Sequence, residues 1–180
     1  MTIGAPSTLG RDLGSLVLDQ VQVRAWERML FVECGDGWVV EEAWRRARRG
    51  YACGVDRSAA LIARANASRA VPGAVEFMTW DGRHLPCPRE SFHVVVAWLA
   101  PRSTAELVEL LAEMHRVTMP RGEVHLLDLS SASSSAMPVF GPDLRETVAR
   151  AGFQLVGPAD SNIPLRSLWR LRKAAPAIVA

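Results

Sequence analysis

Short apolar segments alternate with segments of helical spacing along most of this 180-residue chain. The apolar segments are compact and rich in β-branched or other large apolar residues, as buried strands are. Parallel strands need a crossover connection and are buried on both faces, so this alternation predicts a mostly parallel sheet covered by helices. The predicted parallel strands span 28–33, 51–55, 74–78, 92–97 and 123–129.

The segments between these strands carry apolar residues three and four positions apart, which is typical of amphipathic helices. Gly50 is expected to close one of them, and Ser58 to cap the next. The predicted helices run over 13–21, over 38–49, from Ser58 to about 69, from 103 or 104 to 118, and from Pro142 to Gly152.

Two apolar segments remain at the end of the chain, 153–157 and about 165–172. The loop between them, 158–164, suits an antiparallel hairpin at the edge of the sheet. We expect a loose lead-in over 1–10 and a flexible loop of small residues over 130–136. The predicted organisation is a lead-in and helix over 1–27, one domain over 28–173 and a tail over 174–180.

Composition excludes several classes of protein. The chain has 21 basic and 19 acidic residues, a net charge of +2, so no strong positive field indicates a nucleic acid partner. The longest apolar run, seven residues over 94–100, is far too short to span a membrane. The start of the chain lacks a charged region followed by an apolar one, so we expect no secretory signal and a cytoplasmic location.

Cysteine and histidine spacing gives no sign of a metal site. Cys34, Cys53 and Cys87 form no C-x-x-C pair, which argues against a disulfide framework and a structural zinc. The four histidines have no metal-ligand spacing. We therefore predict no metal.

Candidate chemistry gathers where three predicted strands end. A glycine turn, Cys34-Gly35-Asp36-Gly37, follows the first strand, and glycines there let backbone N–H groups approach a ligand. Asp56 ends the second strand, roughly twenty residues after the turn, where a carboxylate can accept hydrogen bonds from ribose hydroxyls. Asp81 follows the third strand. Ligands of open parallel sheets bind beyond these carboxyl ends.

The succession of motifs across about 28–172 resembles class I S-adenosylmethionine-dependent methyltransferases. The motifs occur in the order of that family: RMLFVECGDG at 28–37, GVDRS at 54–58, WDG at 80–82, FHVVVA at 92–97, RVTMPRG at 116–122 and AGFQL at 151–155. The resemblance implies an α/β fold, a Rossmann-like three-layer sandwich whose seven-stranded, mostly parallel sheet has an antiparallel last strand.

The same resemblance implies S-adenosylmethionine as cofactor. Gly35 and Gly37 would line its methionine and ribose part, Asp56 would hold the ribose hydroxyls, and Asp81 beside Gly82 would face the adenine amino group. The full set of implied cofactor-binding residues is Glu33, Cys34, Gly35, Gly37, Asp56, Arg57, Asp81, Gly82 and Trp98. No catalytic base is assigned, because methyl transfer from a sulfonium mainly requires alignment in a water-poor pocket.

The glycine motif departs from the family pattern, acid-x-Gly-x-Gly-x-Gly. In the register that we favour, Phe31 stands at the acid and Glu33 at the first glycine. In the other register Glu33 is the acid and Val39 replaces the third glycine. Glu33 either reaches the cationic amino group of the cofactor or fills the pocket. A further departure is His93, which stands where the family has an acid.

Each candidate residue also has a structural interpretation. Asp56 could be a helix cap, Asp81 an Asp-Gly turn, and Glu33 the partner of one of the many arginines. Three functions follow: methyl transfer to a small-molecule acceptor, a cofactor-free relative that acts as an interaction or scaffold protein, or a nicotinamide-dependent oxidoreductase. The last lacks the G-x-G-x-x-G fingerprint, because Trp38 and Val40 follow Gly37. We expect a monomer or homodimer.

Overall fold

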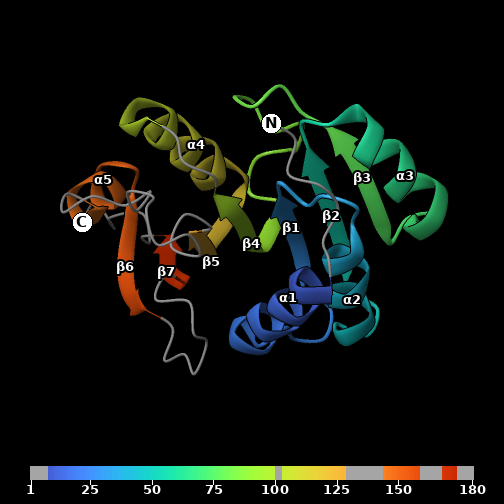
Figure 1. The fold of residues 1–180 in the computed structure, drawn as a ribbon. Coiled ribbons are helices and arrows are strands. Elements are labelled where there is room, and N and C mark those ends of the chain that lie inside the picture. The colour runs from blue at the N-terminus through green and yellow to red at the C-terminus, as the bar shows by residue number, and fades with distance from the viewer. Residues whose placement is uncertain (1–7, 100–102, 129–143, 159–167, 174–180) are drawn as a thin grey trace.

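A seven-stranded sheet forms the centre of the computed structural model, which describes residues 8–99, 103–128, 144–158 and 168–173 (Figure 1). The strand order is β3-β2-β1-β4-β5-β7-β6. The first five of these strands are parallel, and β7 is antiparallel to both of its neighbours. The strands are β1 (Arg28–Val32), β2 (Tyr51–Asp56), β3 (Val75–Thr79), β4 (Phe92–Leu99), β5 (Thr118–Asp128), β6 (Phe153–Pro158) and β7 (Leu168–Lys173).

Helices cover both faces of this sheet and complete the three layers. Buried side chains of the first three helices pack into one apolar core, and those of the last two pack into the core on the opposite face. The helices are α1 (Thr8–Val21), α2 (Trp38–Arg46), α3 (Ala59–Arg69), α4 (Thr104–Val117) and α5 (Leu144–Arg150). The predicted α/β sandwich with an antiparallel last strand is confirmed.

The continuous apolar run of the fourth strand reflects burial on both faces. Val95 packs into the core beneath α4, and its neighbour Val96 packs into the core beneath α1 and α2. Both side chains are fully buried. A strand with only one covered face would alternate apolar and polar residues instead.

Local capping signals in the sequence are also confirmed. Ser103 caps α4 in a capping box with Glu106, and the Ser58 hydroxyl accepts a hydrogen bond from the backbone N–H of Leu61 at the start of α3. The predicted loop over 130–136, most of the loop over 158–164, Pro142 and the tail over 174–180 lie outside the described residues.

Two helix boundaries were predicted wrongly. Helix α1 already begins at Thr8, so part of the predicted lead-in is helical. Helix α2 ends at Arg46 rather than at 49, and the left-handed turn falls on Arg48 and Arg49. Gly50 serves close packing instead, because a Cβ there would lie 2.5 Å from the carbonyl oxygen of Glu27.

The start of the fifth strand also differs from the prediction of a turn followed by a strand at 123. Thr118 of β5 pairs with Phe92 of β4, and the pairing of the two strands resumes only at Glu123, which pairs with Val94. The predicted turn at 120–122 is therefore an excursion within the strand.

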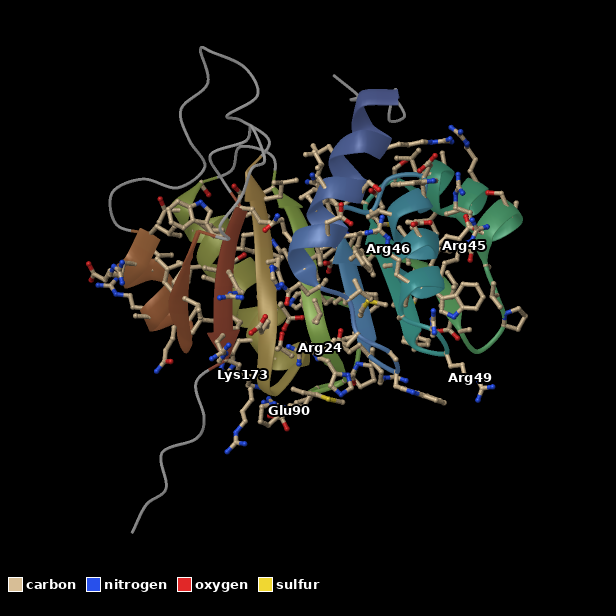
Figure 2. All side chains as sticks on the ribbon, turned by 90° about the horizontal axis from the view of Figure 1, so that it is seen from below. Arg24, Arg45, Arg46, Arg49, Glu90 and Lys173 are labelled. Carbon is tan, nitrogen blue, oxygen red and sulfur yellow. The ribbon has the colours of Figure 1, made fainter. Side chains whose placement is uncertain are left out.

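The arginines of α2 make ion pairs along the helix surface (Figure 2). Arg45 pairs with Glu41. Arg46 binds Asp19 and the Ser15 hydroxyl of α1, so it also joins the two helices. Among the described helices, none has the length and apolarity that a membrane span requires.

Candidate active site

The candidate site lies at the edge of the sheet where the parallel strands end, at the top of β2 and β3 in Figure 1. The turn after β1, Asp56 at the end of β2 and the turn after β3 meet there because these strands are neighbours in register. Strands β1 and β4 adjoin at the point where the strand order reverses. Open parallel sheets bind ligands at such a point.

The turn after β1 takes a left-handed backbone conformation at every second residue. The φ angles are +59° at Glu33, +60° at Gly35 and +76° at Gly37. Glycine adopts these values without strain, whereas a glutamate does so at a cost of about 1 kcal/mol. Of the three residues in this conformation, only Glu33 is not a glycine.

Asp56 is buried, with 7% of its surface exposed, and it joins two loops of the site. One carboxylate oxygen accepts a hydrogen bond from the backbone N–H of Gly35 at 2.9 Å. The other accepts from the N–H of Ser58, the N-cap of α3, at 2.8 Å. A carboxylate offers about four acceptor positions, and these two hydrogen bonds within the described residues use two of them.

Glu33 forms an ion pair with Arg57, the residue that follows Asp56. The distance between Glu33 Oε1 and Arg57 Nε is 2.9 Å. The glutamate side chain is 16% exposed and the arginine side chain 57%. Arg57 also lies beside the turn after β3, because a Cβ at Gly82 would be 3.1 Å from its Cδ. The expected pairing of Glu33 with an arginine is thus present in the structure.

Cys34 is a buried thiol within the turn. Its burial, together with the nearby Asp56 carboxylate, raises the pKa of the thiol well above its usual value. A neutral thiol is a poor nucleophile, so Cys34 contributes shape rather than reactivity. Its sulfur also leaves no room for a side chain at Gly54 of β2, where a Cβ would lie 2.8 Å away.

Asp81 forms an exposed turn with the residues that follow it. One carboxylate oxygen accepts hydrogen bonds from the backbone N–H groups of Arg83 and His84, and the other lies 3.0 Å from His84 Nδ1. These contacts, first those of His84, hold the pKa of Asp81 well below its usual range. The carboxylate is therefore ionised at neutral pH.

Trp98 lies near the end of β4 and packs against Phe31 of β1. Its ring centroid is 6.0 Å from that of Phe31, which is fully buried in β1. The structure therefore gives Phe31 a packing role at the position where the family pattern has an acid. Trp98 is only partly buried, so part of its indole is open to a ligand.

Sequence reasoning missed Arg69, at the end of α3. Its Nε donates to the backbone carbonyl of Asp36 at 3.0 Å, and its terminal nitrogens pair with the carboxylates of Asp36 and Glu41. The side chain is 18% exposed. Arg69 therefore holds the glycine turn against α2 and α3. No local sequence signal marks this contact, which joins residues 33 positions apart.

Hydrogen bonds from two side chains of α4 hold the loop that follows Asp81. Glu113 of α4 accepts a hydrogen bond from the backbone N–H of Leu85, and Arg116 donates to the carbonyls of Leu85 and Cys87. The two side chains also pair with each other at 2.7 Å. The Arg116 hydrogen bond, against the opposing effect of burial, lowers the pKa of Glu113, so its charge persists at neutral pH.

The geometry leaves room for a ligand at Gly35. Apart from its chain neighbours, no heavy atom among the described residues lies within 4 Å of the position that a Cβ would take there. The Gly35 N–H donates to the Asp56 carboxylate, which itself lies more than 4 Å from that Cβ position. The described residues contain no cluster of three His, Cys, Asp or Glu side chains that could hold a metal.

A comparison with protein families matches residues 30–122 to a model described as a methyltransferase domain. The matched segment contains the glycine turn, Asp56, Asp81 and Trp98. It therefore covers the whole set of candidate residues.

Two curated proteins are similar in sequence. A 2-phytyl-1,4-naphtoquinone methyltransferase from Thermosynechococcus vestitus is 25% identical over 126 residues, which are 69% of this chain and 56% of that protein. A demethylmenaquinone methyltransferase from Listeria monocytogenes is 26% identical over 136 residues, 67% of this chain and 57% of that protein. The chain thus spans little more than half the length of these relatives.

Solved structures share the fold at low identity. An S-adenosylmethionine-dependent methyltransferase from Mesorhizobium loti superposes with a TM-score of 0.67 at 16% identity, covering 92% of this chain and 98% of that one. The cyclase SpnF gives a TM-score of 0.70 at 17% identity, covering 97% and 84%. Since the two names differ in reaction, these likenesses bear on the fold alone.

Proposed function

The chain belongs to the methyltransferase domain family, and from that premise we propose that it transfers a methyl group from S-adenosylmethionine to a small-molecule acceptor. The observation that carries the proposal is the open space at Gly35, a residue whose N–H donates to the buried Asp56 carboxylate. The cofactor supplies a methyl group on a positively charged sulfur, an already activated donor.

The residues of the chain have the task of holding the two reactants in line and excluding water. In this proposal Asp56 accepts the ribose hydroxyls, Gly35 and Gly37 let the backbone come close, and Asp81 with Gly82 borders the adenine. Arg57 and Cys34 line the same edge. Trp98 faces the acceptor side. The curated relatives are named for naphthoquinone-type acceptors, so a demethylated naphthoquinone is the first acceptor to test.

Gly35→Ala tests whether the open space at Gly35 receives the cofactor. We expect the added methyl group to occupy the space that the cofactor needs, which lowers cofactor affinity at least tenfold. The free energy of unfolding should fall by only about 1 kcal/mol, from the left-handed backbone. Calorimetric titration with S-adenosylmethionine and its demethylated product measures the affinity.

Gly73→Ala is the matched control for this experiment. Gly73 has a φ of +72° and likewise no described neighbour within 4 Å of a Cβ, but it precedes β3 at the opposite edge of the sheet. We expect the same backbone strain and an unchanged cofactor affinity. Equal affinity in both variants and the wild type would contradict the placement of the cofactor at Gly35.

The second candidate function is a cofactor-free relative of the fold, and the Glu33–Arg57 ion pair is the observation that favours it. Glu33→Gly separates the two functions. Its stability should change little, because relief of the left-handed strain offsets the loss of an ion pair whose arginine is 57% exposed, worth about 1 kcal/mol. If Glu33 binds the cationic amino group, the variant should bind S-adenosylmethionine more weakly than the wild type.

A thermal-shift titration of wild type and Glu33→Gly reads out this difference. We expect the melting temperature of the wild type to rise with S-adenosylmethionine and that of the variant to rise less. Arg57→Gln, which removes the ion pair but keeps the charge of Glu33, serves as the control. A wild type that does not respond beside a variant that does would favour the cofactor-free function.

A further inference from the structure

A groove of about 710 Å³ opens at the edge of the sheet opposite to the candidate active site. Its walls come from the residues before β1, the start of β4, the excursion in β5 and the end of β7. In Figure 2, Arg24 and Glu90, which both line the groove, lie near Lys173 at this edge. The volume is typical of sites for small molecules.

Four side chains of β5 and β7 form the sheet wall of the groove. Glu123 stands opposite Arg172, and His125 stands opposite Arg170. The next pair along the strands, Leu127 and Leu168, belongs to the apolar core beneath α1, so the four polar residues share that face. The polar wall of the groove therefore lies next to the apolar core.

Two polar groups of this wall are buried without a hydrogen bond. His125 is 1% exposed, and neither of its ring nitrogens has a hydrogen-bond partner among the described residues. Its Nε2 lies in ion-pair range of Glu123, 3.6 Å from Oε2, and His125 is the main cause of the lowered pKa of that carboxyl group. Nε of Arg170 is buried and likewise lacks a partner within the described ranges. Each such group costs about 1–3 kcal/mol unless something satisfies it.

The charges around the groove favour an anion. The lining holds one more arginine than glutamate. Each glutamate already has a partner: Glu123 binds Arg172, Glu90 binds Lys173, and Glu27 accepts from the backbone N–H of Arg24. The guanidinium groups of Arg121 and Arg170 have no carboxylate partner among the described residues. The glutamates would repel an extended polyanion, so a small ligand fits better than a nucleic acid.

We propose that this groove binds a small oxygen acid, a carboxylate or a phosphate, with Arg170 Nε–H donating to the anion and His125 supplying a further hydrogen bond. Arg121, which is exposed at the rim, adds a second positive charge. The site is separate from the methyl-transfer site, because it lies where the parallel strands begin and not where they end.

The test is a titration of the full chain with inorganic phosphate and, separately, with acetate, at constant ionic strength set by sodium chloride. The nuclear magnetic resonance signals of the His125 ring and of Arg170 Nε–H report on the site. We expect these signals to shift saturably with at least one of the two anions, and the anion that binds identifies the chemical source. Signals of Asp56 and Gly35 should not move.

Arg170→Gln should weaken the binding at least tenfold, and Arg121→Gln should weaken it several-fold without touching the core. Arg150→Gln on α5, which does not line the groove and is paired only with Glu146 among described residues, should leave it unchanged. The proposal is overturned if neither anion shifts the wild-type signals saturably. It is also overturned if Arg121→Gln and Arg150→Gln bind the anion equally well.

Discussion

Asp56→Ala is expected to lower S-adenosylmethionine affinity about a hundredfold and to destabilise the fold by roughly 2–4 kcal/mol. Both effects have the same origin, because one buried carboxylate joins the glycine turn to α3 and also offers its remaining acceptor positions to the cofactor. A hydrogen bond to a charged group contributes at least about 1.5 kcal/mol, so the loss of two to the ribose, about 3 kcal/mol at that lower value, gives the predicted hundredfold fall in affinity.

Two measurements separate the effects of Asp56→Ala. Calorimetric titration gives the affinity, and thermal unfolding should show a melting temperature lower by about 5–15 °C. Asp56→Asn keeps the shape and one acceptor oxygen, so it should lie between Asp56→Ala and the wild type in both.

Ser58→Ala is the control that weakens the start of α3 and keeps the Asp56 carboxylate. It removes the hydroxyl cap of α3, two residues from Asp56, and should cost about 1 kcal/mol of stability. Cofactor affinity should stay the same. If Asp56→Ala instead binds the cofactor as tightly as the wild type does, Asp56 only joins loops and the proposed site is wrong.

Gly37→Ala is expected to destabilise the fold by about 3 kcal/mol or more, the largest effect on stability that we predict. The residue combines a φ of +76° with close packing, since a Cβ would overlap Phe77 of β3, with Cζ only 2.7 Å away, and lie 3.1 Å from the Cβ of Ala65. Left-handed strain and overpacking each cost about 1–3 kcal/mol. Chemical denaturation measures the sum.

Gly35→Ala measures the backbone strain alone, because Gly35 has a similar φ and open space where Gly37 has Phe77. The difference between the two variants is therefore the packing cost. We expect Gly35→Ala to cost about 1 kcal/mol. Adding Phe77→Leu to Gly37→Ala should recover part of the loss, beyond what the single variants predict. Equal costs for the two glycine variants would show that Gly37 is needed for its backbone conformation alone.

Most of the architecture could be predicted because the signals for it are local. The alternation of apolar runs and amphipathic segments predicts the parallel strands, and the same pattern places Asp56 and the glycine turn at one edge. The errors fall where a local signal competes with a tertiary contact. A glycine after an amphipathic segment predicts the end of a helix. At Gly50, however, a glycine is needed because the carbonyl oxygen of Glu27, just before β1, leaves no room for a side chain.

The candidate site shows the same division. The residue types at the strand ends follow from the sequence, but their partners do not. Arg57 is one of many arginines, and only the placement of β1 beside β2 brings it to Glu33. Two residues of the sheet wall at the other edge, His125 and Arg170, are 45 positions apart and meet through the antiparallel pairing of β5 with β7.

By itself, the sequence determined the layers, the strand direction and the edge at which the glycine turn and its carboxylate lie, because periodicity and turn chemistry act over a few neighbouring residues. Only the tertiary structure decided which arginine meets which acid, why Gly37 tolerates no side chain and where the second groove opens. Those features depend on side chains from distant segments, and the register of the sheet alone sets which of them come within contact distance.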